Sequence, residues 1–235
     1  MAEPLHARMT QTQAMVNGFI RSVYNWMAIG LAITGLVAYY TAHSPSLLSF
    51  ILGNQAVFFV LIIAELGMVF YLSARIQKIE ASTATILFMV YSLLNGLTLS
   101  FIFIVYTASS IASTFFICAA TFGACSIYGM ATKRDLTGVG QFMFMGLIGI
   151  IIASIVNMFL RSPGMNAIIN YIGVFVFVGL TAYDTQKLKQ MALTQPEGLD
   201  AGVARKGAIM GALALYLDFI NMFIFLLQIF GGRRD

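Results

Sequence analysis

Three acidic residues of this 235-residue chain lie inside apolar segments, where a carboxylate is costly to bury. They are Glu65, Asp184 and Asp218. Asp218 is the one charged residue within the 23 residues 208–230. Ionisable residues inside membrane segments tend to line cavities, to pair with one another, or to serve as proton or ion sites. These three carboxylates are therefore the first candidates for the chemistry of the protein.

The sequence lacks the residue patterns that other common kinds of site require. The sequence has no paired His or Cys pattern for zinc, no Gly-rich phosphate loop, and no nucleophile with an evident base. Cys118 and Cys125 are seven residues apart in one apolar stretch, about 10 Å along a helix and too far apart to bridge each other, so both are predicted to be packing residues. We predict no enzyme activity, no resident metal and no cofactor.

The composition is that of a membrane protein. Hydrophobic residues make up 60% of the chain and charged residues only 9%, against about 25% charged in soluble domains. Nucleic acid is not an expected partner, because no solvated basic face is available. Runs of about 20 apolar residues are long enough to cross a bilayer as α-helices. Seven such runs occur, at 23–43, 55–74, 84–106, 110–131, 141–160, 167–185 and 208–230.

The expected fold is thus an all-α integral membrane protein with seven transmembrane helices. Its predicted parts are an N-terminal cytoplasmic segment 1–22, a transmembrane domain 23–230 and a short tail 231–235. The first 22 residues lack the layout of a signal peptide, so the first apolar run is predicted to be a retained span.

The Lys and Arg residues predict the orientation. With seven spans, ten of the 13 fall on one side, which places the N-terminus in the cytoplasm. Arg161 falls on the other side, and so do Arg233 and Arg234. A re-entrant last segment would move those two to the cytoplasmic side, but 23 residues suffice to cross, and we favour seven full spans.

The last apolar segment has a face of small and polar residues, whereas its other faces carry Leu, Ile, Phe and Met. Such a face packs against protein or water rather than lipid, which predicts that this helix lies inside the bundle. The residues of this face are Gly211, Ala214, Asp218, Asn221, Phe225 and Gln228.

Each carboxylate also has a purely structural explanation. Asp184 can pair with Lys187 one turn further on, and Glu65 can be a protonated, hydrogen-bonded structural residue. Arg75, ten residues after Glu65, can extend to the lipid headgroups. In the predicted spans Asp218 lies about 16 Å deep and Asp184 only a few residues deep. The two meet only if the last helix begins outside the membrane plane or if water reaches that depth.

Three stretches resemble the transmembrane Bax inhibitor motif family: YSLLNGLTLSFIF, GLTAYDTQKLKQM and ALALYLDFINMFIFLLQIFG. The resemblance extends over nearly the whole chain from about residue 23, and the short ending GGRRD is similar to the bacterial branch, which implies the bacterial inner membrane. It implies a central last helix enclosed by the other six. It also implies an acid-sensitive calcium leak controlled by two aspartates, at positions matched by Asp184 and Asp218. Arg75 matches the basic residue that acts with that pair.

These implications give a gating hypothesis. Two carboxylates in a low-dielectric site cannot both ionise at low cost, and a nearby Arg favours their ionised forms. Arg75 would bridge to the negatively charged pair at alkaline pH, and protonation would release it and open a path. Calcium is the expected transported ion, held weakly, with Glu65 and Asn221 as candidate pathway residues.

Two other functions fit the same residues. A proton-coupled transporter would use the carboxylates as a relay, although the paired broken helices of such folds are not evident. A non-conducting regulator would bind and restrain other membrane proteins, with the aspartates as structural residues. An intramembrane hydrolase is the least favoured function, for want of a nucleophile and base.

Overall fold

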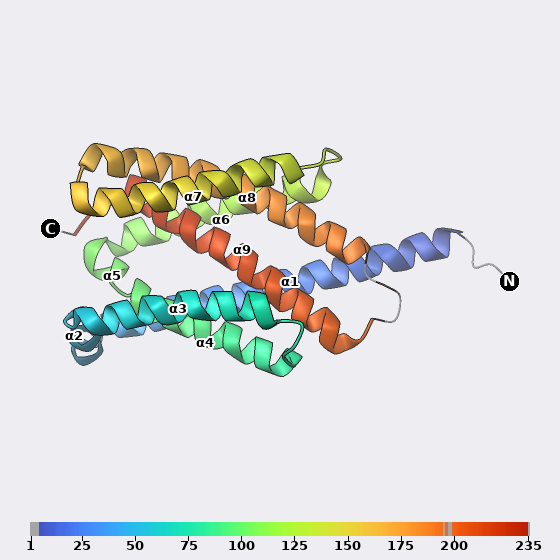
Figure 1. Ribbon diagram of the computed structural model, residues 1–235, viewed down its shortest axis with the longest axis horizontal. Coiled ribbons are helices and arrows are strands. Elements are labelled where there is room, and N and C mark those ends of the chain that lie inside the picture. Colours follow the sequence, from blue (N-terminus) through green and yellow to red (C-terminus); the bar gives the residue numbers. More distant parts are fainter. Residues whose placement is uncertain (1–4, 195, 197–198, 235) are drawn as a thin grey trace. The chain divides into compact units, whose positions relative to one another are not determined.

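The computed structural model describes residues 5–194, 196 and 199–234, with side chains from residue 13 onward (Figure 1). The described part is built of α-helices and contains no strand, only an isolated β-bridge between Tyr106 and Arg233. Its helices are α1 (Leu5–Ala42), α2 (Pro45–Leu52), α3 (Gln55–Arg75), α4 (Ala81–Leu99), α5 (Ile102–Val105), α6 (Ala108–Ala131), α7 (Thr137–Leu160), α8 (Pro163–Leu193) and α9 (Ala201–Phe230). The predicted all-α class is confirmed.

Seven helical segments of the described chain are long and apolar enough to cross a membrane, and each overlaps one predicted span. The third segment, Ala81–Val105, contains two helices, because the chain turns between α4 and α5. The Ser100 hydroxyl donates to the Leu97 carbonyl oxygen at 2.7 Å there. The short helix α2 was not predicted; it begins with Pro45 in its first turn, where proline's missing N–H costs no helical bond.

Two helix starts differ clearly from the predicted spans. Helix α1 begins at Leu5 and takes up most of the predicted N-terminal segment 1–22. Helix α9 begins at Ala201, seven residues before the predicted span. Both extensions are more polar than the spans, so hydropathy alone ended the segments where the apolar residues end.

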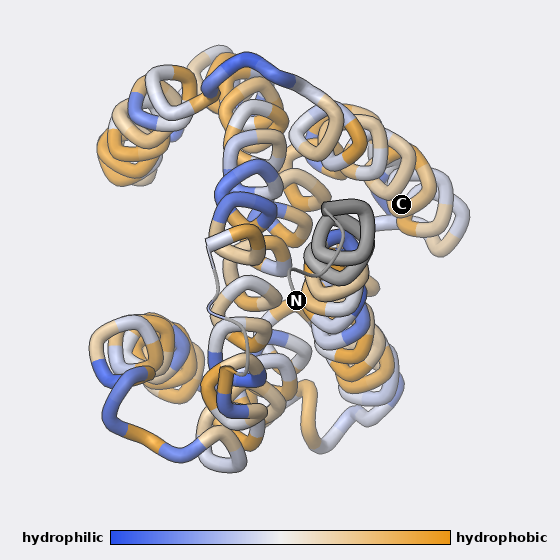
Figure 2. Tube along the Cα trace, turned by 90° about the vertical axis from the view of Figure 1, so that its right-hand side faces the viewer, coloured by the Kyte–Doolittle hydropathy of each residue, from blue (hydrophilic) through white to orange (hydrophobic). Residues whose placement is uncertain are grey.

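The spans differ in how much of their surface is covered. Only 6% of the residues in the most apolar window of α3 and 11% of those in α7 are buried, so their apolar side chains are left to contact lipid. Hydrophobic residues recur along the helices, with hydrophilic residues between them (Figure 2). In α9 the buried share is 67%, the highest of the seven. This burial fits an interior helix; its central place among all six others stays a prediction.

The small and polar face of α9 is not its only buried face. Ile209, Leu215 and Met222 are fully buried, whereas Gln228, predicted to belong to the interior face, is exposed. A helix that is covered on several sides needs no strong amphipathic pattern, which is why the sequence showed only a narrow polar stripe.

The chain divides into two compact units, and α8 and α9 each contribute to both. The first unit comprises Met1–Ile104 and Leu188–Leu213. Within it, α4 packs against α1 and α3, and α2 contacts both of those helices. Gly96 lets α4 approach α1 closely, because a side chain there would meet Val37 and the Thr34 carbonyl oxygen.

The second unit comprises Val105–Lys187 and Ala214–Asp235, and so contains α6, α7, most of α8 and the second half of α9. Glycines permit its close helix contacts. A Cβ atom at Gly129 of α6 would meet the Ala182 carbonyl oxygen of α8, and one at Gly140 of α7 would meet the Tyr183 ring. Helix α6 also reaches α9, where the Cys118 thiol donates to the Phe219 carbonyl oxygen at 3.6 Å.

The residues that follow α9 bond to the residues that precede α6. The Thr107 N–H donates to the Gly232 carbonyl oxygen at 3.1 Å, and the Arg234 N–H donates to the Val105 carbonyl oxygen at 2.9 Å. The end of α9 therefore lies at the same end of the second unit as the start of α6. This arrangement supports a last segment that crosses fully rather than re-entering.

We predict that residues 109 and 234 face the same side of the membrane. Cysteines placed at Ser109 and at Arg234, in a chain with Cys118→Ala and Cys125→Ala, should react with a membrane-impermeant maleimide from the same side. Labelling of sealed vesicles before and after permeabilisation measures this. Reaction from opposite sides would exclude the arrangement of the tail described above.

We also predict that Gly129→Ala destabilises the protein by about 1–3 kcal/mol, because α6 and α8 must separate to admit the methyl group. The matched control is Gly123→Ala on the same helix, since a Cβ atom there meets nothing within 4 Å. The midpoint of thermal unfolding in detergent should fall for Gly129→Ala and stay level or rise for Gly123→Ala. Equal midpoints for the two variants would contradict the close contact.

Candidate functional site

The structure brings two of the three predicted carboxylates together in the second unit. Asp184 lies on α8 and Asp218 on α9, and the two side chains interact electrostatically. Asp218 is only 4% exposed, and its Oδ2 atom has no hydrogen-bond partner among the described residues. Asp184 is half-buried. A buried acceptor without a partner is costly in a purely structural setting.

The surroundings of Asp218 are largely apolar. Leu215 and Met222, one turn away on either side, are fully buried, and the neighbouring Phe219 packs edge-on against Phe115 and Phe122 of α6. These three described neighbours are apolar and do not compensate a negative charge at this position. The site favours a neutral carboxyl, or one that shares its charge with a polar neighbour.

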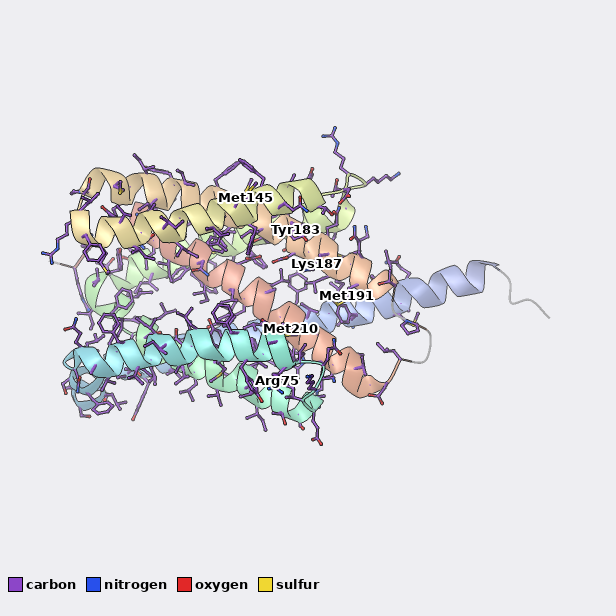
Figure 3. All side chains as sticks on the ribbon, in the orientation of Figure 1. Arg75, Met145, Tyr183, Lys187, Met191 and Met210 are labelled. Atoms are coloured by element: carbon purple, nitrogen blue, oxygen red, sulfur yellow. The ribbon has the colours of Figure 1, made fainter. Side chains whose placement is uncertain are left out.

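Asp184 has a cationic neighbour as well as an acidic one. The charge of Lys187, one turn further along α8, acts on Asp184. The Lys187 ammonium lies 5.9 Å from the centre of the Tyr183 ring, and Figure 3 labels both residues. The charge of Lys187 thus acts on Asp184 beside that of Asp218, and the structural pairing of Asp184 with Lys187 stays a prediction.

Helix α9 begins at Ala201, seven residues before the predicted span at residue 208. Whether its first turns lie outside the membrane plane stays a prediction, and so does the depth of the two aspartates.

Gln186 holds α8 beside the loop that precedes α7, although no sequence pattern predicts this contact. Its Nε2 donates to the Arg134 carbonyl oxygen and its Oε1 accepts from the Leu136 N–H, each at 2.8 Å. Gln186 is 6% exposed and holds the α6–α7 loop against α8, two residues from Asp184. Such a contact joins residues about 50 positions apart and leaves no local pattern.

The same loop, between α6 and α7, contains Asp135, an exposed aspartate with hydrogen-bond donors close by. The Thr137 hydroxyl and backbone N–H both donate to the Asp135 carboxylate, at 2.6 and 2.9 Å. These bonds lower the pKa of Asp135 below its usual value, since they favour the ionised form. Asp135 is therefore an exposed, ionised residue outside the spans and a useful comparison for the buried pair.

Glu65 belongs to the first unit and is surrounded by polar side chains of α4. The Thr98 hydroxyl donates to Glu65 Oε1 at 2.8 Å, and the Asn95 amide lies 3.5 Å from Oε2 and 3.3 Å from the Tyr91 hydroxyl. The sequence identified Glu65 but none of these partners, which are separated from it by about 30 residues. Hydrogen bonding of Glu65 is thus present, as the structural explanation required.

The two other predicted site residues lie apart from these contacts. Asn221 is half-buried on α9, and its amide donates to the Leu217 carbonyl oxygen of its own helix at 2.8 Å. Arg75 is exposed and ends α3, in the first unit (Figure 3). Its approach to the aspartate pair stays a prediction. In the part of the chain that the structure describes, no three His, Cys, Asp or Glu side chains gather as metal ligands.

Comparison with known proteins assigns the chain to a family. Residues 16–235 match the family model described as inhibitor of apoptosis-promoting Bax1. The chain is 53% identical to inner membrane protein YbhL of Escherichia coli strain K12, over 98% of both chains. It is 44% identical to an uncharacterized protein of Borreliella burgdorferi, over 93% of this chain and 94% of the other. An uncharacterized membrane protein of Streptococcus pyogenes serotype M1 is 37% identical, over 98% and 99%. This seven-span integral membrane protein belongs to the family of inhibitors of apoptosis-promoting Bax1.

Proposed function

We propose that the protein is a calcium leak of the bacterial inner membrane that opens when the cytoplasm becomes acidic. The proposal is supported by the burial of Asp218 on α9, with Asp184 on α8 near enough for its charge to act on that carboxyl. The 53% identity to an inner membrane protein of E. coli supports the location. The N-terminus is assigned to the cytoplasm from the distribution of Lys and Arg.

The pair is suited to respond to protons. Two carboxylates that share a poorly solvated site take up and release protons as a coupled unit. At alkaline pH the pair carries net negative charge, which attracts a cation. As the pH falls, the pair gains protons and that attraction weakens. The sign of the response is thus closed when alkaline and open when acidic.

Arg75 is the proposed cationic partner. It ends α3, a helix with few buried residues, so a change in its electrostatic contacts meets little resistance from packing. Release of Arg75 would let α3 shift and free a path. Glu65, held by Thr98 and Asn95, and Asn221 are the proposed pathway residues. Scattered carboxylates bind calcium weakly, which suits passage better than storage.

We predict that replacing either aspartate removes the response to pH. Calcium entry into proteoliposomes of the purified protein should rise when the pH is stepped from about 8 to about 6. Asp184→Asn and Asp218→Asn remove a titrating group and should leave entry nearly independent of pH. Asp135→Asn, an acidic residue outside the spans, is the matched control and should keep the wild-type profile.

Both aspartate variants keeping the wild-type profile would refute the gating role of the pair. Folded wild-type protein without calcium entry at either pH would refute the leak itself. That second result would favour a non-conducting regulator, and co-purification of a membrane partner would be the next measurement.

We also predict that Arg75→Gln raises calcium entry at about pH 8, because the closed state loses its cationic partner, while entry at about pH 6 changes little. Lys78→Gln removes the same charge three residues further on and is the control. An unchanged flux at alkaline pH in Arg75→Gln, with the protein folded, would remove Arg75 from the mechanism.

A further inference from the structure

Gln186 lies on α8 two residues after Asp184, and both ends of its side-chain amide are hydrogen-bonded. The Nε2 group donates to the Arg134 carbonyl oxygen, and the Oε1 atom accepts from the Leu136 N–H, each at 2.8 Å. Both partners are backbone groups of the loop between α6 and α7, and Gln186 is buried. One side chain of α8 thus satisfies a donor and an acceptor of a loop on another part of the chain.

The contacts on either side of Asp184 decide which way this residue points. The Tyr183 ring lies against Gly140 of α7, and Gln186 faces the loop before α7. Consecutive residues of an α-helix are turned by about 100°, because 3.6 residues complete one turn. Asp184 is therefore turned by about 100° from Tyr183 and by about 160° from Gln186. It points away from α7 and the loop, which agrees with the action of its charge on Asp218 of α9.

A turn of α8 about its axis would break these contacts and would move Asp184 at the same time. The Ala182 carbonyl oxygen lies close to Gly129 of α6, which leaves little room for such a turn. The turn would also take the Gln186 amide away from the N–H of Leu136, a buried residue. A buried N–H group without a partner costs free energy, so the two hydrogen bonds of Gln186 oppose the turn.

We propose that Gln186 is a positioning residue for the proton response of the aspartate pair: by holding α8 to the α6–α7 loop, it fixes the direction in which Asp184 faces Asp218. Both hydrogen bonds of Gln186 go to the loop, so its action on the pair passes through the helix and through Asp184. The inference rests on the proposed function, but it concerns how the pair is held and not which ion passes.

The charged groups around Asp184 determine what this positioning controls. The charges of Asp218 on α9 and of Lys187 on α8 act on Asp184. At their close contacts with α8, α6 and α7 present glycines, which carry no charge, and Cys118 of α6 bonds to a carbonyl oxygen of α9. A turn of α8 moves Lys187 together with Asp184 and leaves Asp218 behind. The loop that Gln186 holds carries three charged residues, all of them exposed: Lys133, Arg134 and Asp135.

Calcium entry into proteoliposomes tests the proposal through its dependence on pH. Gln186→Met removes the amide and keeps an unbranched side chain of similar length. The ratio of entry at about pH 6 to entry at about pH 8 should fall toward one, by up to about tenfold, as expected for coupled residues of one network. Gln186→Asn keeps an amide on a shorter side chain and should give an intermediate ratio. Gln190→Met makes the same change at an exposed position one turn further on and should keep the wild-type ratio.

A double-mutant cycle separates positioning from a general loss of stability. If Gln186 acts through Asp184, Gln186→Met should change the ratio no further in a chain that already carries Asp184→Asn. A purely structural role would lower the amount of folded protein at both pH values and would leave the ratio unchanged. A wild-type ratio in Gln186→Met, or an equal further change in the Asp184→Asn chain, would overturn the proposal. If Gln186→Met does not fold, Gln186→Asn serves in both comparisons.

Infrared spectroscopy tests the positioning role without calcium flux. The pH-difference spectrum shows the carbonyl stretch of carboxyl groups that take up protons, and its loss in Asp184→Asn and Asp218→Asn assigns a band to the pair. We expect Gln186→Met to shift this band and Gln190→Met to leave it in place, because the stretch depends on the surroundings of the carboxyl group.

The two readouts keep the two proposals apart. An unchanged infrared band in Gln186→Met would overturn the positioning role even where the wild-type protein conducts calcium. A shifted band, in a protein without calcium entry at either pH, would refute the leak and support the positioning role. A wild-type spectrum without a band from the pair would show that the pair takes up no proton in this range, and would overturn both.

Discussion

The carboxylate of Asp218, buried among apolar side chains, is the constraint on which the rest of the second unit depends. An apolar residue at this position would make the fold more stable, because burying a carboxylate without a full set of hydrogen bonds costs free energy. Asp184 makes the position still less favourable for a second negative charge. We propose that such a pair responds to protons and to cations, because either one offsets its negative charge.

The helix contacts around the pair limit how far it can relax. Gly129 lets α6 approach the Ala182 carbonyl oxygen closely, and Gly140 lets α7 approach the Tyr183 ring. Helix α8 is therefore in close contact with both α6 and α7 immediately before Asp184. Gln186 fixes the turn that follows. Because α8 can neither rotate nor slide freely here, Asp184 cannot easily move away from Asp218 to lower the electrostatic cost.

Hydropathy predicted the spans well because each one needs about 20 apolar residues and little else. The same reasoning failed wherever a helix continues into polar residues, as at Leu5 and Ala201. Asp184 and Asp218 could be identified because carboxylates are rare in apolar segments. The residues that support the carboxylates could not be identified. Gln186 beside the pair, and Thr98 and Asn95 beside Glu65, act across 30 or more residues, and polar groups of this kind are ordinary in membrane helices.

Helices α8 and α9 carry the chain from one unit to the other, and this links the sites through covalent structure. Asp184 is four residues before Leu188, where α8 enters the first unit, and Asp218 is five residues after Leu213, where α9 leaves it. Arg205 and Asp218 both belong to helix α9. A helix transmits rotation or displacement of one end more readily than a loop does, because its backbone hydrogen bonds resist bending. Any force that moves the start of α9 therefore acts on the helix that carries the buried carboxylate, and the contacts of Trp26 and Gln77 with its first turns oppose such movement.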